Sequence, residues 1–204
     1  MIAIIDYGMG NVGSVLKALK RINVKATITS DVETIQKAEK IILPGVGHFG
    51  SAMKRLQQSG LIDVLNENVI INKKPILGIC LGMQLFANFS EEGNSNGLGW
   101  IDAEVKRFNV SDKMKYKIPH IGWNSLLHQN NSCLMNNLEH EKLFYFVHSY
   151  HMICKNERDV LTLTDYSYNF VSAVQKENIF GTQFHPEKSH KQGLEILKNF
   201  VEKC

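Results

Sequence analysis

The chain has 204 residues, of which 44% are hydrophobic and 21% are charged, and its formal net charge is +3. This length is sufficient to bury a core without disulfides or a structural metal, and we expect one domain over residues 1–204. The weak net charge argues against a dedicated nucleic-acid binder. The longest apolar stretch, residues 75–87, contains two glycines and a glutamine, which excludes a membrane span.

The N-terminus has no basic, apolar leader, and the four cysteines form neither a CxxC pair nor a metal-ligand spacing. We therefore predict a cytoplasmic protein with no membrane association, no metal and no cofactor. Because the cytosol is reducing, Cys133, Cys154 and Cys204 are predicted to be packing or surface residues.

Over the first ninety residues, short apolar runs alternate with apolar residues at helical spacing. Strands are predicted at residues 2–5, 25–28, 41–43 and 75–79. Helices are predicted over residues 15–22, after an Asp31 N-cap, and at residues 51–58, 61–71 and 81–89. Such alternation is typical of crossover units in a mainly parallel sheet.

The pattern changes after Glu91, where strand-like runs follow one another with few helices between them. Strands are predicted at residues 100–108, 143–147, 160–164, 170–175 and 179–184, and a final helix at residues 191–201. We therefore predict an α/β fold in which antiparallel strands extend a mainly parallel sheet and a C-terminal helix closes it.

A glycine-rich turn follows the first predicted strand. Gly8-Met9-Gly10-Asn11-Val12-Gly13 fits the fingerprint of dinucleotide-binding turns, and Asp31 follows where a ribose-binding acid is expected. However, Asp6 and Tyr7 stand between the apolar run and the first glycine, which fits that fingerprint poorly. A plain turn between strand and helix is the alternative, and the rest of the chain decides between them.

The fourth predicted strand meets its helix at Gly78-Ile79-Cys80-Leu81-Gly82, which matches a nucleophile elbow with cysteine in place of serine. Glycines two positions on either side allow strand and helix to approach closely. The sulfur then lies at a helix N-terminus, which favours the thiolate. A buried core cysteine is the alternative, but the complete five-residue pattern favours a nucleophile.

A thiol nucleophile needs an imidazole to move its proton and a carboxylate to orient that imidazole. Gln183-Phe184-His185-Pro186-Glu187 follows the last predicted strand. Its histidine and glutamate are two residues apart in an extended segment, so both side chains can point the same way. We therefore predict a catalytic triad of Cys80, His185 and Glu187.

An oxyanion hole needs two donors, and the backbone N–H of Leu81 is the first that we predict. The second is expected from Gly45, Val46 and Gly47, which follow the third predicted strand. In a parallel sheet this segment lies at the same carboxyl edge as Cys80. An ordinary strand-to-helix turn is the alternative for this segment.

The remaining distinctive segments complete a set of six motifs in order: Asp6-Tyr7-Gly8-Met9-Gly10-Asn11, Leu43-Pro44-Gly45-Val46-Gly47, Gly78-Ile79-Cys80-Leu81-Gly82-Met83-Gln84, Pro119-His120-Ile121-Gly122-Trp123-Asn124, Phe146-Val147-His148-Ser149-Tyr150 and Gln183-Phe184-His185-Pro186-Glu187-Lys188. Together they resemble the class I (triad-type) glutamine amidotransferases over the whole chain. Within that family they are most similar to the glutaminase subunits of imidazole glycerol phosphate synthase. The resemblance implies a flavodoxin-like fold and accounts for the glycine-rich turn without a dinucleotide.

The resemblance also implies the chemistry. Cys80 attacks the side-chain amide of glutamine, His185 protonates the leaving ammonia, and water hydrolyses the thioester. Gln84 and Glu92 match the positions that hold the α-amino and α-carboxylate ends of the substrate, and Ser149 and Tyr150 match positions that bind it through the backbone.

A partner is implied as well. In this family ammonia passes into a (β/α)₈ cyclase that makes imidazole glycerol phosphate and AICAR in histidine biosynthesis, and Asn11, Trp123 and Lys188 match positions that face it. The resemblance further implies that the free subunit is nearly inactive, because the peptide at Gly45–Gly47 must turn before its N–H can serve.

One departure leaves an alternative acceptor open. Trp100 stands where histidine-pathway subunits usually carry an aliphatic residue, and it resembles relatives that supply ammonia to a sugar amidotransferase in surface-polysaccharide biosynthesis. Two further alternatives are a non-catalytic scaffold and a cysteine peptidase or thiol hydrolase. The intact triad argues against the scaffold, and Gln84 with the Lys188 motif favours glutamine over a peptide.

Overall fold

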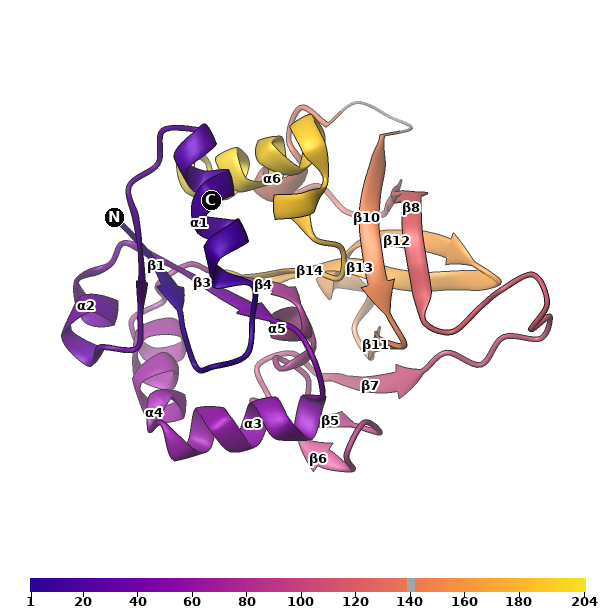
Figure 1. The fold of residues 1–204 in the computed structure, drawn as a ribbon, viewed down its shortest axis with the longest axis horizontal. Helices are drawn as coiled ribbons and strands as arrows, with labels where there is room; N and C mark the ends of the chain where they lie inside the picture. Colours follow the sequence, from indigo (N-terminus) through magenta and orange to yellow (C-terminus); the bar gives the residue numbers. More distant parts are fainter. Residues whose placement is uncertain (139–141) are drawn as a thin grey trace.

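The protein is described by a computed structural model that covers residues 1–138 and 142–204. Its centre is a twelve-stranded sheet, flanked by helices at the N-terminal half of the chain and extended by antiparallel strands in the second half (Figure 1). The strand order is β2-β1-β3-β4-β14-β13-β11-β7-β5-β6, with β12 beside β13 and β9 beside β12.

Five neighbouring strands form the parallel part of the sheet: β1 (Ile2–Ile5), β2 (Ala26–Thr29), β3 (Lys40–Gly45), β4 (Ile76–Cys80) and β14 (Ile179–Thr182). Strands β1 and β4 are buried along their whole length. They are short continuous apolar runs rather than alternating ones because helices cover both faces of this part of the sheet.

Two apolar layers hold these helices against the sheet. On one face, α1 (Val12–Arg21) and α6 (His190–Glu202) pack against side chains such as Ile4 and Leu77. On the other face, α2 (Val32–Lys37), α3 (Phe49–Gln58) and α4 (Leu61–Asn66) pack against Ala3 and Ile41. Successive strand residues thus supply opposite layers, as the pleat requires.

The rest of the sheet is mostly antiparallel: β13 (Tyr168–Lys176), β12 (Val160–Tyr166), β11 (Tyr150–Cys154), β9 (Leu127–His128) and β7 (Ala103–Arg107), with β5 (Phe89–Ser90) and β6 (Ser95–Asn96) at the edge, where β5 runs parallel to β7. A separate two-stranded sheet pairs β8 (His120–Ser125) with β10 (Leu143–His148). The predicted α/β fold with antiparallel extension is therefore confirmed.

The predicted helix at residues 81–89 is wrong in length. Helix α5 covers only Leu81–Gln84, and the chain turns before entering β5. The carbonyl groups that would continue the helix accept hydrogen bonds from a distant segment instead: Leu98 donates to Leu85 at 2.8 Å and Trp100 donates to Phe86 at 2.9 Å. For the same reason the strand predicted at residues 100–108 begins only at Ala103.

Further elements differ from the predictions. Strands β5, β6, β8, β9 and β11 lie outside the predicted strands, and the predicted helix at residues 61–71 is α4 followed by the π-helix η1 (Glu67–Ile71). The short 3-10 helices are η2 (Cys133–Met135), η3 (Glu157–Asp159) and η4 (Pro186–Lys188).

The cysteine prediction is wrong for two residues. Cys133 and Cys204 form a disulfide, with their Cα atoms 5.5 Å apart. The two residues are separated by 71 positions, so no local spacing announces the pair; α6 brings the end of the chain over η2. Asn199 reinforces the same contact, because its side-chain amide donates to the carbonyls of Leu134 and Asn136. Cys154 is free and half-buried.

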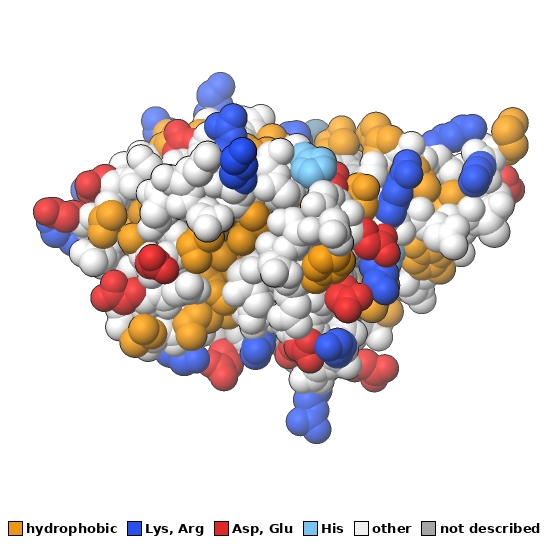
Figure 2. Space-filling view, turned by 90° about the horizontal axis from the view of Figure 1, so that it is seen from below, with side chains coloured by type: hydrophobic (Ala, Val, Ile, Leu, Met, Phe, Trp, Pro, Cys, Tyr) orange, Lys and Arg blue, Asp and Glu red, His pale blue; other side chains and the backbone are white. Residues whose placement is uncertain are grey.

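Within the described ranges, no helix is long and apolar enough to cross a membrane. On the face seen from below Figure 1, acidic and basic side chains are interspersed with hydrophobic ones (Figure 2). This mixture agrees with the small net charge of +3.

Candidate active site

Cys80 ends β4 in a conformation that side chains rarely adopt, with φ of 54° and ψ of −110°. The glycine at position 82 is required by a close approach, since an added Cβ would lie 1.8 Å from the Leu43 carbonyl oxygen. At Gly78 an added Cβ would lie 2.6 Å from the Phe86 ring. The sharp turn therefore depends on both glycines, and strained backbone of this kind clusters at functional sites.

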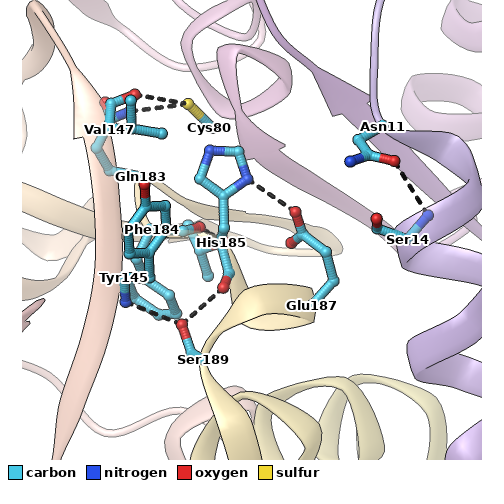
Figure 3. A network of polar contacts seen from close by, with 11 residues as sticks. Asn11, Ser14, Cys80, Tyr145, Val147, Gln183, Phe184, His185, Glu187 and Ser189 are labelled. Atoms are coloured by element: carbon cyan, nitrogen blue, oxygen red, sulfur yellow. Dashed lines mark hydrogen bonds and ion pairs between the residues drawn. The ribbon is translucent and has the colours of Figure 1, made fainter. Parts of the chain in front are cut away.

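His185 follows β14, which lies beside β4 in the sheet. Its backbone is fixed at both ends: its N–H donates to the Tyr145 carbonyl at 2.9 Å, and its carbonyl accepts from the Ser189 hydroxyl at 2.6 Å. The same hydroxyl accepts from the Tyr145 N–H at 3.0 Å (Figure 3). The imidazole therefore stands on a rigid support.

The side chains of His185 and Glu187 form a buried pair. The Nδ1 atom of His185 lies 2.8 Å from Oε1 of Glu187, and the two side chains are 1% and 2% exposed. The imidazole stands between the glutamate and the sulfur of Cys80 (Figure 3). Its Nε2 atom, the one away from the glutamate, is buried and has no hydrogen-bond partner among the described residues.

Two opposing effects set the charge of His185. Burial disfavours the imidazolium, but Cys80 and the Glu187 carboxylate favour it, and together they raise the pKa of His185 to about 10. A protonated imidazole beside a thiolate is the arrangement in which a cysteine is most nucleophilic at neutral pH.

The sulfur also contacts two groups that are not among the predicted site residues. Nε2 of Gln183 donates to Sγ of Cys80 at 3.6 Å, and Sγ lies 3.9 Å from the Val147 carbonyl oxygen. The Gln183 side chain is fully buried and is oriented by Gln84, whose Nε2 donates to its Oε1 at 2.9 Å. Gln183 lies within the His185 motif, so its place in the motif was the available signal.

A cavity of about 390 Å³ opens above Cys80. Its lining contains nearly all of the residues predicted for catalysis and substrate binding; Gly45 and Glu187 stand outside it. The lining residues are Val46, Gly47, Cys80, Leu81, Gln84, Glu92, Pro119, Val147, His148, Ser149, Tyr150 and His185. A cavity of this size is sufficient for an amino acid.

The predicted oxyanion segment lies beside the sulfur. Gly45 is the last residue of β3 and pairs in register with Cys80, and Leu81 begins the helix on the other side. Val46 is 40% exposed, and Gly47 has a φ of +100°. The segment then enters α3, whose first N–H, at Phe49, donates to Oε2 of Glu92 at 2.8 Å.

The part of the lining that contains Ser149 and Tyr150 is built around one carbonyl. The Tyr150 carbonyl accepts from Nε2 of Gln84 at 2.9 Å and from Nδ1 of His148 at 2.8 Å. His120 lies behind His148, with 3.2 Å between Nδ1 and Nε2. Burial lowers the pKa of His120 to about 4 and that of His148 to about 3, so both imidazoles are neutral near pH 7. This network fixes the backbone of Ser149 and Tyr150.

The residues predicted to face a partner, Asn11, Trp123 and Lys188, are exposed. Trp123 is 42% exposed and stacks on His190, with 4.8 Å between ring centroids. The Lys188 ammonium lies 5.7 Å from the Tyr145 ring, which also contacts Trp123 edge-on. Asn11 caps α1, accepting from the Ser14 N–H at 3.2 Å (Figure 3).

Trp100 belongs to the core and not to the site. It is 4% exposed, stacks on Phe86 with 5.1 Å between centroids, and donates from its indole N–H to the Asn66 side chain at 2.8 Å. Asp31 likewise is an N-cap, accepting from the Thr34 N–H at 2.8 Å. In the part of the chain that the structure describes, no group of three His, Cys, Asp or Glu side chains is placed to hold a metal ion.

Comparisons with known proteins agree with this geometry. Residues 3–204 match the family model for glutamine amidotransferase class-I. Imidazole glycerol phosphate synthase subunit HisH 2 from Methanococcus maripaludis is 52% identical over 204 residues, covering 100% of both chains. HisH 2 from Pseudomonas aeruginosa is 49% identical, covering 99% of both chains, and HisH from Leptospira interrogans is 46% identical, covering 98% of this chain and 99% of its own.

Solved structures show the same fold at low sequence identity. A crystal structure of a glutamine amidotransferase is 18% identical, with a TM-score of 0.72 and coverage of 99% of this chain and 98% of its own. The structure of PurLQS from Thermotoga maritima is also 18% identical, with a TM-score of 0.72 and coverage of 98% and 96%.

Proposed function

Since this chain belongs to the class I glutamine amidotransferase family, we propose that it hydrolyses glutamine to glutamate and ammonia and is the glutaminase subunit of an imidazole glycerol phosphate synthase. The observation that carries the proposal is the buried row of Cys80, His185 and Glu187, of which Cys80 and His185 line a cavity of amino-acid size.

The proposed reaction has two half-steps. The Cys80 thiolate attacks the side-chain amide carbon of glutamine, and Nε2 of the His185 imidazolium gives its proton to the departing nitrogen, which leaves as ammonia. The neutral imidazole then takes a proton from a water molecule, whose oxygen attacks the γ-glutamyl thioester. Glutamate leaves, and the thiolate–imidazolium pair is restored. Glu187 stays ionised and orients the ring through Nδ1.

Negative charge develops on the amide oxygen in both half-steps. We assign its stabilisation to the backbone N–H of Leu81 together with an N–H from Gly45–Gly47, the two segments that flank the sulfur. An oxyanion donor of this kind contributes about 10²–10³ in rate. Gln183 donates a hydrogen bond to the sulfur itself and so helps to hold it in position before attack.

Substrate orientation is assigned to four residues that line the cavity. Gln84 and Glu92 are proposed to hold the α-amino and α-carboxylate ends of glutamine, and Ser149 and Tyr150 are proposed to bind through their backbone. The two hydrogen bonds to the Tyr150 carbonyl support this assignment, because they hold in place the backbone that is proposed to bind the substrate.

The partner is proposed to be the cyclase subunit that uses the ammonia to make imidazole glycerol phosphate and AICAR in histidine biosynthesis. The relatives' names, which describe subunits of such a synthase, support a two-chain enzyme. So does an exposed apolar face next to the triad, where Ile121 is 60%, Trp123 42% and Leu143 46% exposed. Trp100 lies in the core and outside the cavity lining, so its side chain has no direct contact with the site.

The test measures glutamate release by the chain alone, with its cognate cyclase, and with the cyclase plus its nucleotide ligand. We expect low activity alone and a rise with each addition. A glutamine-analogue electrophile should add one label per chain, and Cys80→Ala should abolish both labelling and activity. Labelling that survives Cys80→Ala would refute the assignment of the nucleophile. Productive use of the ammonia by a sugar amidotransferase and not by the cyclase would refute the assignment of the partner.

A further inference from the structure

The glycine-rich turn at residues 6–11 forms a cradle under the oxyanion segment. An added Cβ at Gly10 would lie 3.2 Å from the Pro44 carbonyl oxygen, and one at Gly47 would lie 2.9 Å from the terminal methyl of Met9. An added Cβ at Gly45 would lie 2.7 Å from the hydroxyl oxygen of Tyr7. The turn therefore lies against Gly45 and Gly47 of the segment that carries the proposed donor and against Pro44 immediately before it.

Tyr7 is the unusual member of this cradle. The residue is 6% exposed, and its hydroxyl has no hydrogen-bond partner among the described residues. Burial, together with the charge of Cys80, raises the pKa of Tyr7 above its usual value, so the hydroxyl keeps its proton. A buried hydroxyl without a partner destabilises the structure that contains it, and its persistence points to a second arrangement in which it is paired.

Peptide geometry identifies that arrangement. In a trans peptide the N–H and the C=O point in opposite directions, so turning the Val46 N–H toward the cavity sends the Gly45 carbonyl away from it. Val46 lines the cavity, whereas Tyr7 approaches Gly45 from the protein interior and is absent from the lining. The displaced carbonyl then needs a buried donor, and the Tyr7 hydroxyl lies against the residue that bears it.

We propose that Tyr7 is a positioning residue whose hydroxyl donates to the Gly45 carbonyl when the oxyanion segment is in its active arrangement. The inference rests on the proposed glutaminase function and deepens it by naming the group that stabilises the active state. It also gives a role to the glycine-rich turn that resembles a dinucleotide site: the turn supports the oxyanion segment. Asn11 stands at the exposed end of the same turn, where it caps α1.

The test is Tyr7→Phe, which removes one oxygen atom, measured in the complex with the cognate cyclase. We expect kcat for glutamate release to fall about 5- to 30-fold, the effect of losing one buried hydrogen bond in the active state, with KM unchanged. The melting temperature of the free chain should be unchanged or higher, because the variant loses a hydroxyl that is unpaired at rest. Tyr116→Phe, at a ring that packs on Tyr166 outside the cavity, is the matched control.

Alkylation of Cys80 by iodoacetamide needs the thiolate but no oxyanion hole, and its rate should be the same in the variant and the wild type. Unchanged kcat would overturn the inference while leaving the proposed function intact. A fall in kcat together with the melting temperature would show a structural role, and a changed alkylation rate would assign the hydroxyl to the sulfur; both overturn it. Absence of glutaminase activity in the wild-type complex would refute the proposed function, and this inference with it.

Discussion

Replacing Glu187 with glutamine removes one charge from the buried pair and keeps the shape of the side chain. The Nδ1–Oε1 distance of 2.8 Å and exposures of 1% and 2% make this a fully desolvated, charge-assisted contact. Such a hydrogen bond contributes about 1.5–3 kcal/mol. At 1.36 kcal/mol per pH unit, its loss lowers the pKa of His185 by about 1–2 units. The same loss in the transition state corresponds to a fall in kcat of about 10- to 150-fold.

The sign of the pH dependence follows from the direction of the shift. The folded-state pKa of His185 is raised from 6.5 to about 10, so the imidazolium is retained through neutral pH and lost as the pH rises toward 10. Protonation of the leaving ammonia needs that imidazolium. The alkaline limb of kcat should therefore lie near pH 10 in the wild type and at lower pH in Glu187→Gln.

The free energy of unfolding should change with pH over the same range. A raised pKa stabilises the folded state fully below the unfolded-state value of 6.5, and this contribution disappears as the pH rises through about 10. The difference in free energy of unfolding between wild type and Glu187→Gln should accordingly be larger at pH 6 than at pH 9.

The assay is a pH series of glutamate release with the cyclase present, paired with urea unfolding at pH 6 and pH 9. Glu33→Gln is the matched control, since Glu33 forms a surface ion pair with Lys37 at 3.1 Å and its side chain is 77% exposed. Near-normal kcat and an unmoved alkaline limb in Glu187→Gln would refute the orienting role of this carboxylate.

Three further outcomes are expected. Gly82→Ala should abolish activity and lower the melting temperature, because its Cβ would overlap the Leu43 carbonyl, whereas Gly13→Ala, with no atom within 4 Å, should leave both unchanged; equal behaviour of the two would contradict the close-approach argument. Trp123→Ala should weaken cyclase binding by at least about 2 kcal/mol in a titration, with unchanged Cys80 alkylation in the free chain; unaltered affinity would remove this face from the interface. Cys204→Ser should lower the free energy of unfolding by about 2–4 kcal/mol under oxidising conditions and by nothing in excess dithiothreitol, and equal loss in both would show that the thiol matters by packing.

The parts of the fold that the sequence predicts are those with a local cause. The apolar run of β1, the Asp31 cap of α2 and the periodicity of α6 each act within a few residues, and each prediction is confirmed to within about two residues. The predictions that were wrong concern features with causes farther away in the sequence. Helix α5 ends early because the backbone N–H groups of Leu98 and Trp100 donate to the carbonyls that would continue it, and the local sequence pattern does not indicate these hydrogen bonds.

The candidate site divides in the same way. Cys80 and His185 stand in motifs whose residue types and flanking elements suit their proposed roles, and the sheet brings both to one edge. Gln183 stands in the same motif as His185, but its contact with the Cys80 sulfur, at 3.6 Å, is a product of the fold that the motif alone does not specify. The contact of Tyr7 with Gly45 and the Cys133–Cys204 disulfide likewise join segments that are far apart in the sequence, and residue spacing does not predict such contacts.

The place of β14 in the sheet bears on how the protein is synthesised. This strand leaves the ribosome after every other strand, yet it fills a central position between β4 and β13. Cys80 therefore emerges long before the imidazole that would activate it, and a nascent chain has a thiol without its base. An incomplete chain cannot consume glutamine, but it exposes the edge of β4, an apolar strand that is open to pairing with other chains until β14 inserts.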